Sequence, residues 1–266
     1  MGLARVIRYH TLCIMKPINF LFIVLAFLIN ALLVYSVYCE AIPTGNIQAA
    51  AFMFYLPINL PFDLFRWILV LLPILLIVGS FINNEINERS SYSLLQMKSF
   101  HRWFHSLIIV CFFSTVVTFI VGFTVTGAVV SITPREIVSD KWINSFTLLY
   151  TSNEWTLLVH QFFLLVLSVF LIVLLKILFT FLVDNSSFSF LLTIIFSVTS
   201  IVVGNAYPSI LKWLPLTYGL FVFQEINDYS FIWSYVCLMI SLLIVYIFTF
   251  IVFIIHKESL FMNKLE

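Results

Sequence analysis

A single polar stretch interrupts the apolar chain and decides how it must fold: Asn83-Asn-Glu-Ile-Asn-Glu-Arg-Ser-Ser-Tyr-Ser-Leu-Leu-Gln-Met-Lys-Ser-Phe-His-Arg-Trp103. It carries two glutamates, two arginines and a lysine, whereas the segments on either side are compatible with hydrocarbon. Because charged side chains are costly inside a bilayer, we expect this stretch to lie outside one. It is too short to be a domain and has the size of a surface that another protein could bind.

The composition indicates an integral membrane protein. Hydrophobic residues make up 62% of the chain, charged residues only 9%, and the mean hydropathy is +1.12. A soluble domain has roughly a quarter of charged residues, so this chain would have too little polar surface for water. The net charge of +1, without a basic patch, gives no indication of nucleic-acid binding. The four cysteines lack metal-ligand spacing and imply no disulfide framework.

The apolar segments predict six transmembrane helices in an all-α fold, with residues 1–266 forming one transmembrane domain. A helix needs about 20 apolar residues to cross about 30 Å of hydrocarbon. The runs are continuous and do not alternate, which argues against a membrane barrel. The predicted spans cover residues 18–38, 64–81, 104–125, 155–175, 188–206 and 232–255. The fourth span could continue to Val183, since the residues before Val183 are also apolar.

The distribution of positive charge predicts the orientation. An even number of spans puts both termini on one side, and with the N-terminus inside, nine of the thirteen lysines and arginines are cytoplasmic. This excess agrees with the positive-inside rule, and we predict that both termini are cytoplasmic. In that orientation Trp103 marks the inner interface and the other five tryptophans lie at the outer side. We expect a multi-pass protein of the cell membrane.

The sequences of three connecting segments indicate their structure. Residues 1–17 mix basic and apolar side chains, which suits a helix lying on the inner membrane face; an ordinary basic flank explains them equally well. Residues 184–187 are a polar turn between the fourth and fifth spans. Residues 207–223 are apolar but broken by Pro208, Pro215 and Gly219, which predicts a re-entrant or interfacial hairpin on the outer side, before the sixth span.

Catalytic chemistry finds little support in the sequence. It has no phosphate-binding loop and no dinucleotide fingerprint, so we expect no enzyme activity and no cofactor bound by this chain. His101 and His105 share a helix face and would fit a metal. Nothing in the sequence is placed to complete such a site, so we interpret them as interfacial histidines. Glu85 and Glu88 could act as an intramembrane catalytic pair, but a solvated extension of the second span explains them better.

Few polar residues fall within the predicted spans. Lys176 lies roughly 31 Å beyond Trp155 along a helix, at the inner interface, where we expect it to snorkel towards water. We expect Asn30 to form a hydrogen bond between helices and Gly79 to allow close helix packing.

Two sequence segments resemble a known family. Asn84-Glu-Ile-Asn-Glu-Arg89 with Ser93-Leu-Leu-Gln-Met-Lys-Ser-Phe-His-Arg-Trp103, and the proline-broken segment 207–223, are similar to the permease subunits of the type 2 ABC export family. The first is similar to a version found in small Gram-positive permeases linked with bacteriocin or antimicrobial-peptide export and immunity. The resemblance covers the whole chain in layout and places it in the membrane of a Gram-positive bacterium.

The resemblance implies a coupling helix within residues 84–102, through which a separate ATPase drives export of an amphipathic peptide or lipid-like cargo. It implies two ATPase subunits, which hold the ATP and Mg²⁺, and a second permease chain, the same or different, in contact with membrane lipid. The residues expected to contact the ATPase are Glu85, Glu88, Arg89, Tyr92, Leu95, Met97 and Lys98. The outer gate would comprise Pro208, Pro215 and Gly219.

A second class of function remains open from the residues alone. The alternative is a membrane protein that transports nothing, either an immunity factor that binds a partner or an intramembrane enzyme. Copurification of an ATPase favours the first class, and activity of the isolated chain without nucleotide favours the second.

Overall fold

The computed structural model describes residues 3–39, 42–43, 45–55, 61–87, 100–133, 153–183, 185–223 and 231–262. Within these ranges the chain is helical and forms no strand, which confirms the all-α prediction. The elements are α1 (Leu3–Ile14), α2 (Pro17–Tyr38), α3 (Asn46–Phe52), α4 (Phe62–Asn87), α6 (Phe100–Ile132), α8 (Glu154–Val183), α9 (Ser186–Ala206), the 3-10 helices η2 (Pro208–Trp213) and η3 (Pro215–Thr217), and α11 (Phe231–Met262).

Six helices of the described chain are long and apolar enough to cross a membrane: α2, α4, α6, α8, α9 and α11. Each of the six predicted spans lies within one of these helices. Several are longer than predicted, and α8 reaches Val183. At 1.5 Å per residue its 30 residues measure about 45 Å, more than the hydrocarbon thickness. The mainly apolar residues up to Val183 therefore continue α8 beyond the predicted span.

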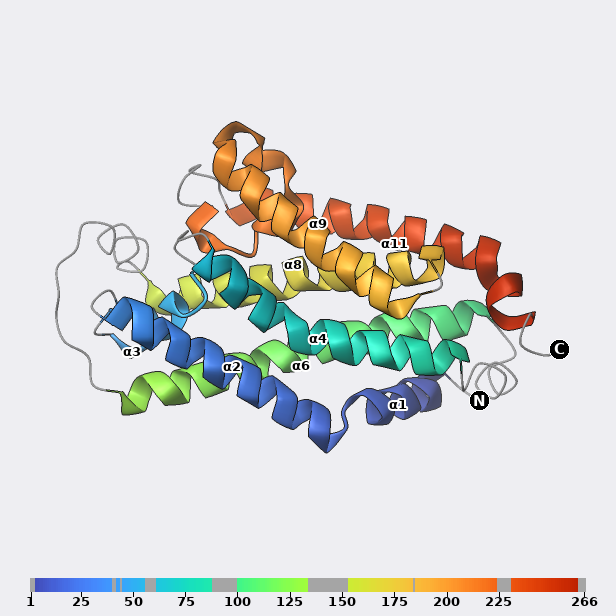
Figure 1. Cartoon of the computed structure of the whole chain (residues 1–266), viewed down its shortest axis with the longest axis horizontal. Coiled ribbons are helices and arrows are strands. Elements are labelled where there is room, and N and C mark those ends of the chain that lie inside the picture. Colours follow the sequence, from blue (N-terminus) through green and yellow to red (C-terminus); the bar gives the residue numbers. More distant parts are fainter. Residues whose placement is uncertain are drawn as a thin grey trace.

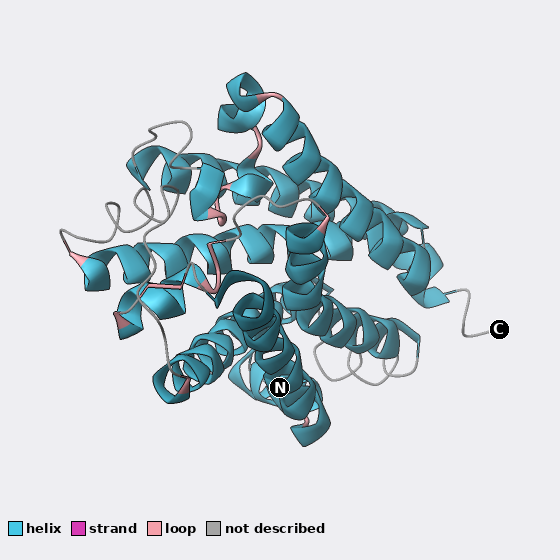
Figure 2. Ribbon diagram, turned by 60° about the vertical axis from the view of Figure 1, so that its left-hand side comes forward, coloured by secondary structure: helices cyan, strands magenta, loops and turns pink. Residues whose placement is uncertain are grey.

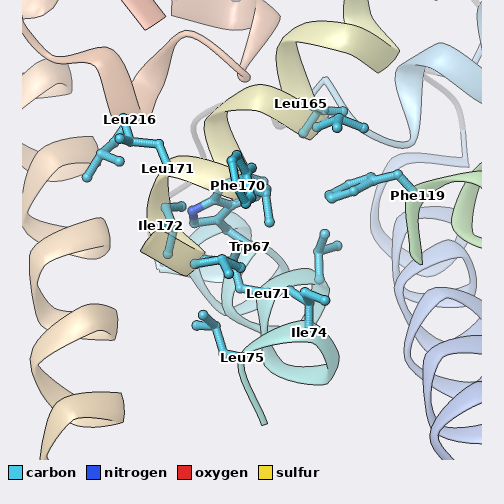
Figure 3. Packing of buried hydrophobic residues seen from close by; sticks show 14 of the residues in the cluster. Trp67, Leu71, Ile74, Leu75, Phe119, Leu165, Phe170, Leu171, Ile172 and Leu216 are labelled. Carbon is cyan, nitrogen blue, oxygen red and sulfur yellow. The ribbon is translucent and has the colours of Figure 1, made fainter. Parts of the chain in front are cut away.

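The six long helices pack side by side in one bundle (Figure 1). α4 and α8 are the most buried of them, and α11 is the most exposed. Figure 3 shows Trp67 and Leu71 of α4 in the same core as Leu165 and Phe170 of α8. The indole of Trp67 also donates to Ser197 Oγ of α9 at 3.2 Å. The centre of the bundle is thus built by α4 and α8, with the other spans around them.

The turn between α8 and α9 forms where the sequence predicts it. Asn185 caps α9, because its side-chain oxygen accepts from the backbone N–H groups of Ser187 and Phe188, each at 3.0 Å. A cap of this kind satisfies donors that have no partner within the helix. In Figure 1 this turn lies at the end of the bundle that also holds α1 and the last turns of α11.

The short helix α3 is not predicted from the sequence. Its seven residues, rich in alanine, are too few to show an apolar period. Side chains of α8 hold both of its ends: Gln48 Nε2 donates to Glu154 Oε1 at 2.8 Å, and Gln161 Nε2 donates to the carbonyl oxygen of Ala51 at 3.0 Å. Figure 2 shows that the described ribbon is helical apart from short loops.

Candidate functional site

Most residues expected to contact an ATPase lie outside the described residues. They are Glu88, Arg89, Tyr92, Leu95, Met97 and Lys98. The structure describes the two ends of the polar segment, which are the last turns of α4 with Glu85 and the beginning of α6. α1 packs against both α4 and α6. The polar segment is therefore attached at both ends to helices that pack against α1.

A histidine of α1 links the two helices that flank the polar segment. His10 Nε2 lies 3.3 Å from Glu85 Oε2 of α4, and His10 Nδ1 lies 3.3 Å from Ser106 Oγ of α6. All three side chains are fully buried. The Ser106 hydroxyl donates to the Trp103 carbonyl oxygen at 2.7 Å, so its oxygen is left to accept from the imidazole. The contact between His10 and Glu85 is within ion-pair distance but does not have the geometry of a hydrogen bond.

The sequence predicts Glu85 at the contact with an ATPase, but in this chain its side chain is not exposed for such a contact. Its side chain is buried because α1 folds back along α4 and α6 and brings His10 against it. The ring of Phe81 lies edge-on to His10 at 5.4 Å and closes one side of the contact. Glu85 therefore connects helices inside this chain. Sequence reasoning assigned no role to His10, and only its place on a mixed basic and apolar helix could have suggested one.

Glutamate, histidine and serine also form the catalytic set of some hydrolases, which bears on the alternative of an intramembrane enzyme. A nucleophilic serine directs its hydroxyl proton at the histidine and needs room for a substrate. Here the hydroxyl of Ser106 donates to its own helix, and all three side chains are fully buried. The geometry favours a structural bridge between three helices.

The predicted pair of interfacial histidines contacts α11. His105 Nδ1 lies 2.7 Å from the hydroxyl oxygen of Tyr246, and the ring of His101 lies 5.5 Å from that of Phe250. No group of three metal-ligating side chains occurs among the described residues. The two histidines thus attach the beginning of α6 to α11, next to the buried bridge of His10.

The residues expected to form an outer gate lie in a hairpin of two 3-10 helices. Pro208 begins η2 and is exposed, and Pro215 begins η3 and is half-buried. Tyr218 donates from its hydroxyl to the carbonyl oxygen of Lys212 at 2.5 Å, which joins the two arms. Proline suits the first position of such turns because its missing N–H would have no partner there.

The hairpin is fixed to α8 by a close approach at Gly219. Ser168 Oγ of α8 donates to the Leu216 carbonyl oxygen at 2.9 Å. A Cβ added at Gly219 would lie 2.8 Å from Ser168 Cβ and 3.3 Å from Leu165 Cα. A side chain at this position would therefore push the hairpin away from α8.

An apolar cavity of about 290 Å³ lies where the hairpin meets α8, α9 and α11. Leu171, Phe196, Ile244 and Pro215 are among its lining residues. A predicted gate residue thus stands in the wall of a space that would accept an apolar group.

A buried ion pair occupies the first turns of α4, at the end opposite Glu85. Arg66 donates to Asp63 at 2.7 Å, to Asn30 of α2 at 3.3 Å and to the Met53 carbonyl oxygen at 2.8 Å. The Tyr38 hydroxyl donates to the second oxygen of Asp63 at 2.9 Å. Arg66 is one of the four cations that the charge count assigns to the outer side, and the structure buries it completely. The predicted interhelical hydrogen bond of Asn30 is confirmed.

Lys176 is likewise buried, and the prediction that it snorkels to water is wrong. The turn after α8 brings the beginning of α9 back over its ammonium group, which donates to the Ser186 carbonyl oxygen at 2.7 Å. Gly79 of α4 packs against it: an added Cβ would lie 3.2 Å from Lys176 Cε, in agreement with the close packing predicted for that glycine.

Comparison with models of protein families, with curated proteins and with solved structures finds no match to this chain.

Proposed function

We propose that the chain is the membrane-spanning permease subunit of an ATP-driven ABC exporter. The observation that carries the proposal is the buried bridge of His10, Glu85 and Ser106 beside the ends of the polar segment. A partner that binds the segment between α4 and α6 would move both helices and, through His10, α1 as well. A plain loop between two spans would need no such connection.

ATP would act on a partner protein, and this chain would convert its motion. The ATPase holds the nucleotide and Mg²⁺, and the polar segment receives the displacement when two ATPase subunits close on each other. α4 transmits it along the bundle, since α4 is largely buried and runs from the polar segment to the opposite end. The hairpin of η2 and η3 stands against α8 and α9 as the candidate gate.

The cargo proposed is an amphipathic peptide or lipid-like molecule that leaves the cell. The cavity beside Pro215 is lined mainly by aliphatic and aromatic side chains, which would recognise apolar groups. Two copies of the permease, or one copy with a different permease, would enclose the path. The exposed apolar face of α11, which carries Met239, Leu243 and Ile247, is available for that partner or for lipid.

Copurification tests the proposal. The chain, isolated from native membranes in mild detergent, should bring an ATPase with it, and Leu95→Asp should remove the ATPase by placing an unpaired charge in the contact. Ile132→Asp is the matched control, because Ile132 is 82% exposed at the far end of α6. Retention of the ATPase by the Leu95 variant, or absence of any ATPase from the wild-type preparation, contradicts the proposal. Activity of the isolated chain without nucleotide would favour a membrane protein that transports nothing.

A further inference from the structure

Lys176 is a buried cation whose hydrogen bonds leave its charge unbalanced. Its ammonium group donates to the Ser186 carbonyl oxygen and to Ser189 Oγ, and lies 3.4 Å from both Ser186 Oγ and Thr180 Oγ1. Every one of these partners is neutral. No carboxylate of the described residues lies within ion-pair distance of Lys176, whereas Arg66 has Asp63. Burial of an uncompensated charge is costly, which indicates that an anion from outside the chain completes the site.

The third proton of the ammonium group has only long contacts. An ammonium group has three donors, and two short hydrogen bonds occupy two of them. The remaining contacts at 3.4 Å are weak. Gly79 of α4 brings the cavity wall close to this group, because an added Cβ there would lie 3.6 Å from Lys176 Nζ. One donor is thus available to an oxygen atom of a ligand.

A cavity of about 300 Å³ opens at this place between α4, α8 and α9. Lys176, Ser186 and Ser187 line its polar part, and Leu76, Phe190 and Leu191 line its apolar part. Leu76 and Leu191 are 43% and 55% exposed, so the apolar wall continues onto the outer surface of the bundle. Asn185 already occupies the backbone N–H groups at the beginning of α9, so an anion would bind to Lys176 and the serine hydroxyls.

The cavity lies at the level of a lipid headgroup. α9 has 21 residues and measures about 31 Å, close to the thickness of the hydrocarbon layer. Its first residue, Ser186, therefore lies at the boundary between hydrocarbon and headgroups. Figure 1 shows that the beginning of α9 lies at the end of the bundle that holds α1 and the last turns of α11.

We propose that this cavity binds the phosphate group of an anionic phospholipid, with Lys176 as counter-ion and the acyl chains along the exposed apolar faces of α4 and α9. A free phosphate compound shares the charge but gains nothing from the apolar wall, so a lipid is the better occupant. The proposal does not depend on the transport function. It assigns a lipid site to any role that this chain has in the membrane.

Lipid titration followed by native mass spectrometry of the intact protein tests the site. We expect saturable binding of one phosphatidylglycerol, tighter than that of phosphatidylcholine, and about tenfold weaker binding of phosphatidylglycerol to Lys176→Met. Lys212→Met is the matched control, because Lys212 is an exposed cation on η2, remote from the cavity. Equal binding of the two lipids, or wild-type affinity of the Lys176 variant, overturns the proposal.

A second variant keeps the test decisive if the Lys176 variant fails to fold. Ser187 is exposed at the cavity mouth in the first turn of α9, where Ser187→Glu should be tolerated and should repel an anion. Asn205→Glu, in the exposed last turn of α9, is its control. Binding of phosphatidylglycerol should weaken about tenfold in the Ser187 variant alone. Unchanged binding overturns the proposal, and so does displacement of the lipid by inorganic phosphate at equal concentration.

Discussion

The two ends of α4 both bury a carboxylate, and they do so in different ways. Asp63 pairs with Arg66 on the same helix at 2.7 Å, and hydrogen bonds from Tyr38 and to Asn30 and Met53 complete the arrangement. Glu85 pairs with His10 of another helix at 3.3 Å. The first pair can form as soon as α4 is helical, whereas the second exists only while α1 is docked. The end of α4 with Asp63 is therefore fixed within the helix, whereas the contacts of the end with Glu85 depend on the position of α1.

The largest effect should come from Arg66→Met, which leaves Asp63 buried without its counter-ion. We expect a loss of about 3–5 kcal/mol in the free energy of unfolding, because removal of one partner of a buried pair is strongly destabilising. Chemical unfolding in detergent measures it. Lys212→Met, at an exposed position, should change the stability by less than about 0.5 kcal/mol. A loss below about 1 kcal/mol for the Arg66 variant would mean that this end is no more fixed than the other.

A smaller effect is expected for His10→Ala at the opposite end. The variant loses one contact at 3.3 Å that does not have hydrogen-bond geometry, so we expect a loss of about 1–3 kcal/mol, less than at Arg66. This loss of stability should be confined to the helices around His10. Amide hydrogen exchange should become faster in α1 and in the last turn of α4, and stay unchanged in the first turns of α4. Uniformly faster exchange along the bundle would remove the distinction between the two ends.

The hairpin offers a third and smallest test. Gly219→Ala places a methyl group 2.8 Å from Ser168 Cβ and 3.3 Å from Leu165 Cα and should cost about 1–2 kcal/mol. Gly127→Ala is the matched control, since nothing lies within 4 Å of a Cβ there. The control should be neutral or slightly stabilising, because alanine favours a helix over glycine. A Gly219 variant as stable as the control would indicate a hairpin that moves freely from α8.

Long apolar runs made the spans predictable, and the turn at Asn185 followed from its capping residue. The contacts of the buried charged residues could not be predicted from the sequence in this way. Lys176 was interpreted as an interfacial side chain because its distance from Trp155 put it at the right depth, but depth does not say which way a turn folds back. The charge count assigns Arg66 to the outer side from its place in the sequence alone, and such a count does not show that Asp63 and Asn30 enclose it. His10 became recognisable only when α1, α4 and α6 were brought together.

The most direct test of the permease assignment is ATP hydrolysis by the copurified ATPase in lipid nanodiscs, with and without an amphipathic peptide. We expect the peptide to stimulate ATP hydrolysis in the wild-type complex. His10→Ala should keep the ATPase bound and lose most of the stimulation, because α1 no longer follows α4 and α6. Full stimulation in the His10 variant would contradict the bridge as the coupling element. Stimulation of the wild-type complex only by a sugar or an inorganic ion would contradict the proposed cargo, and no stimulation by any solute would contradict the transport function itself.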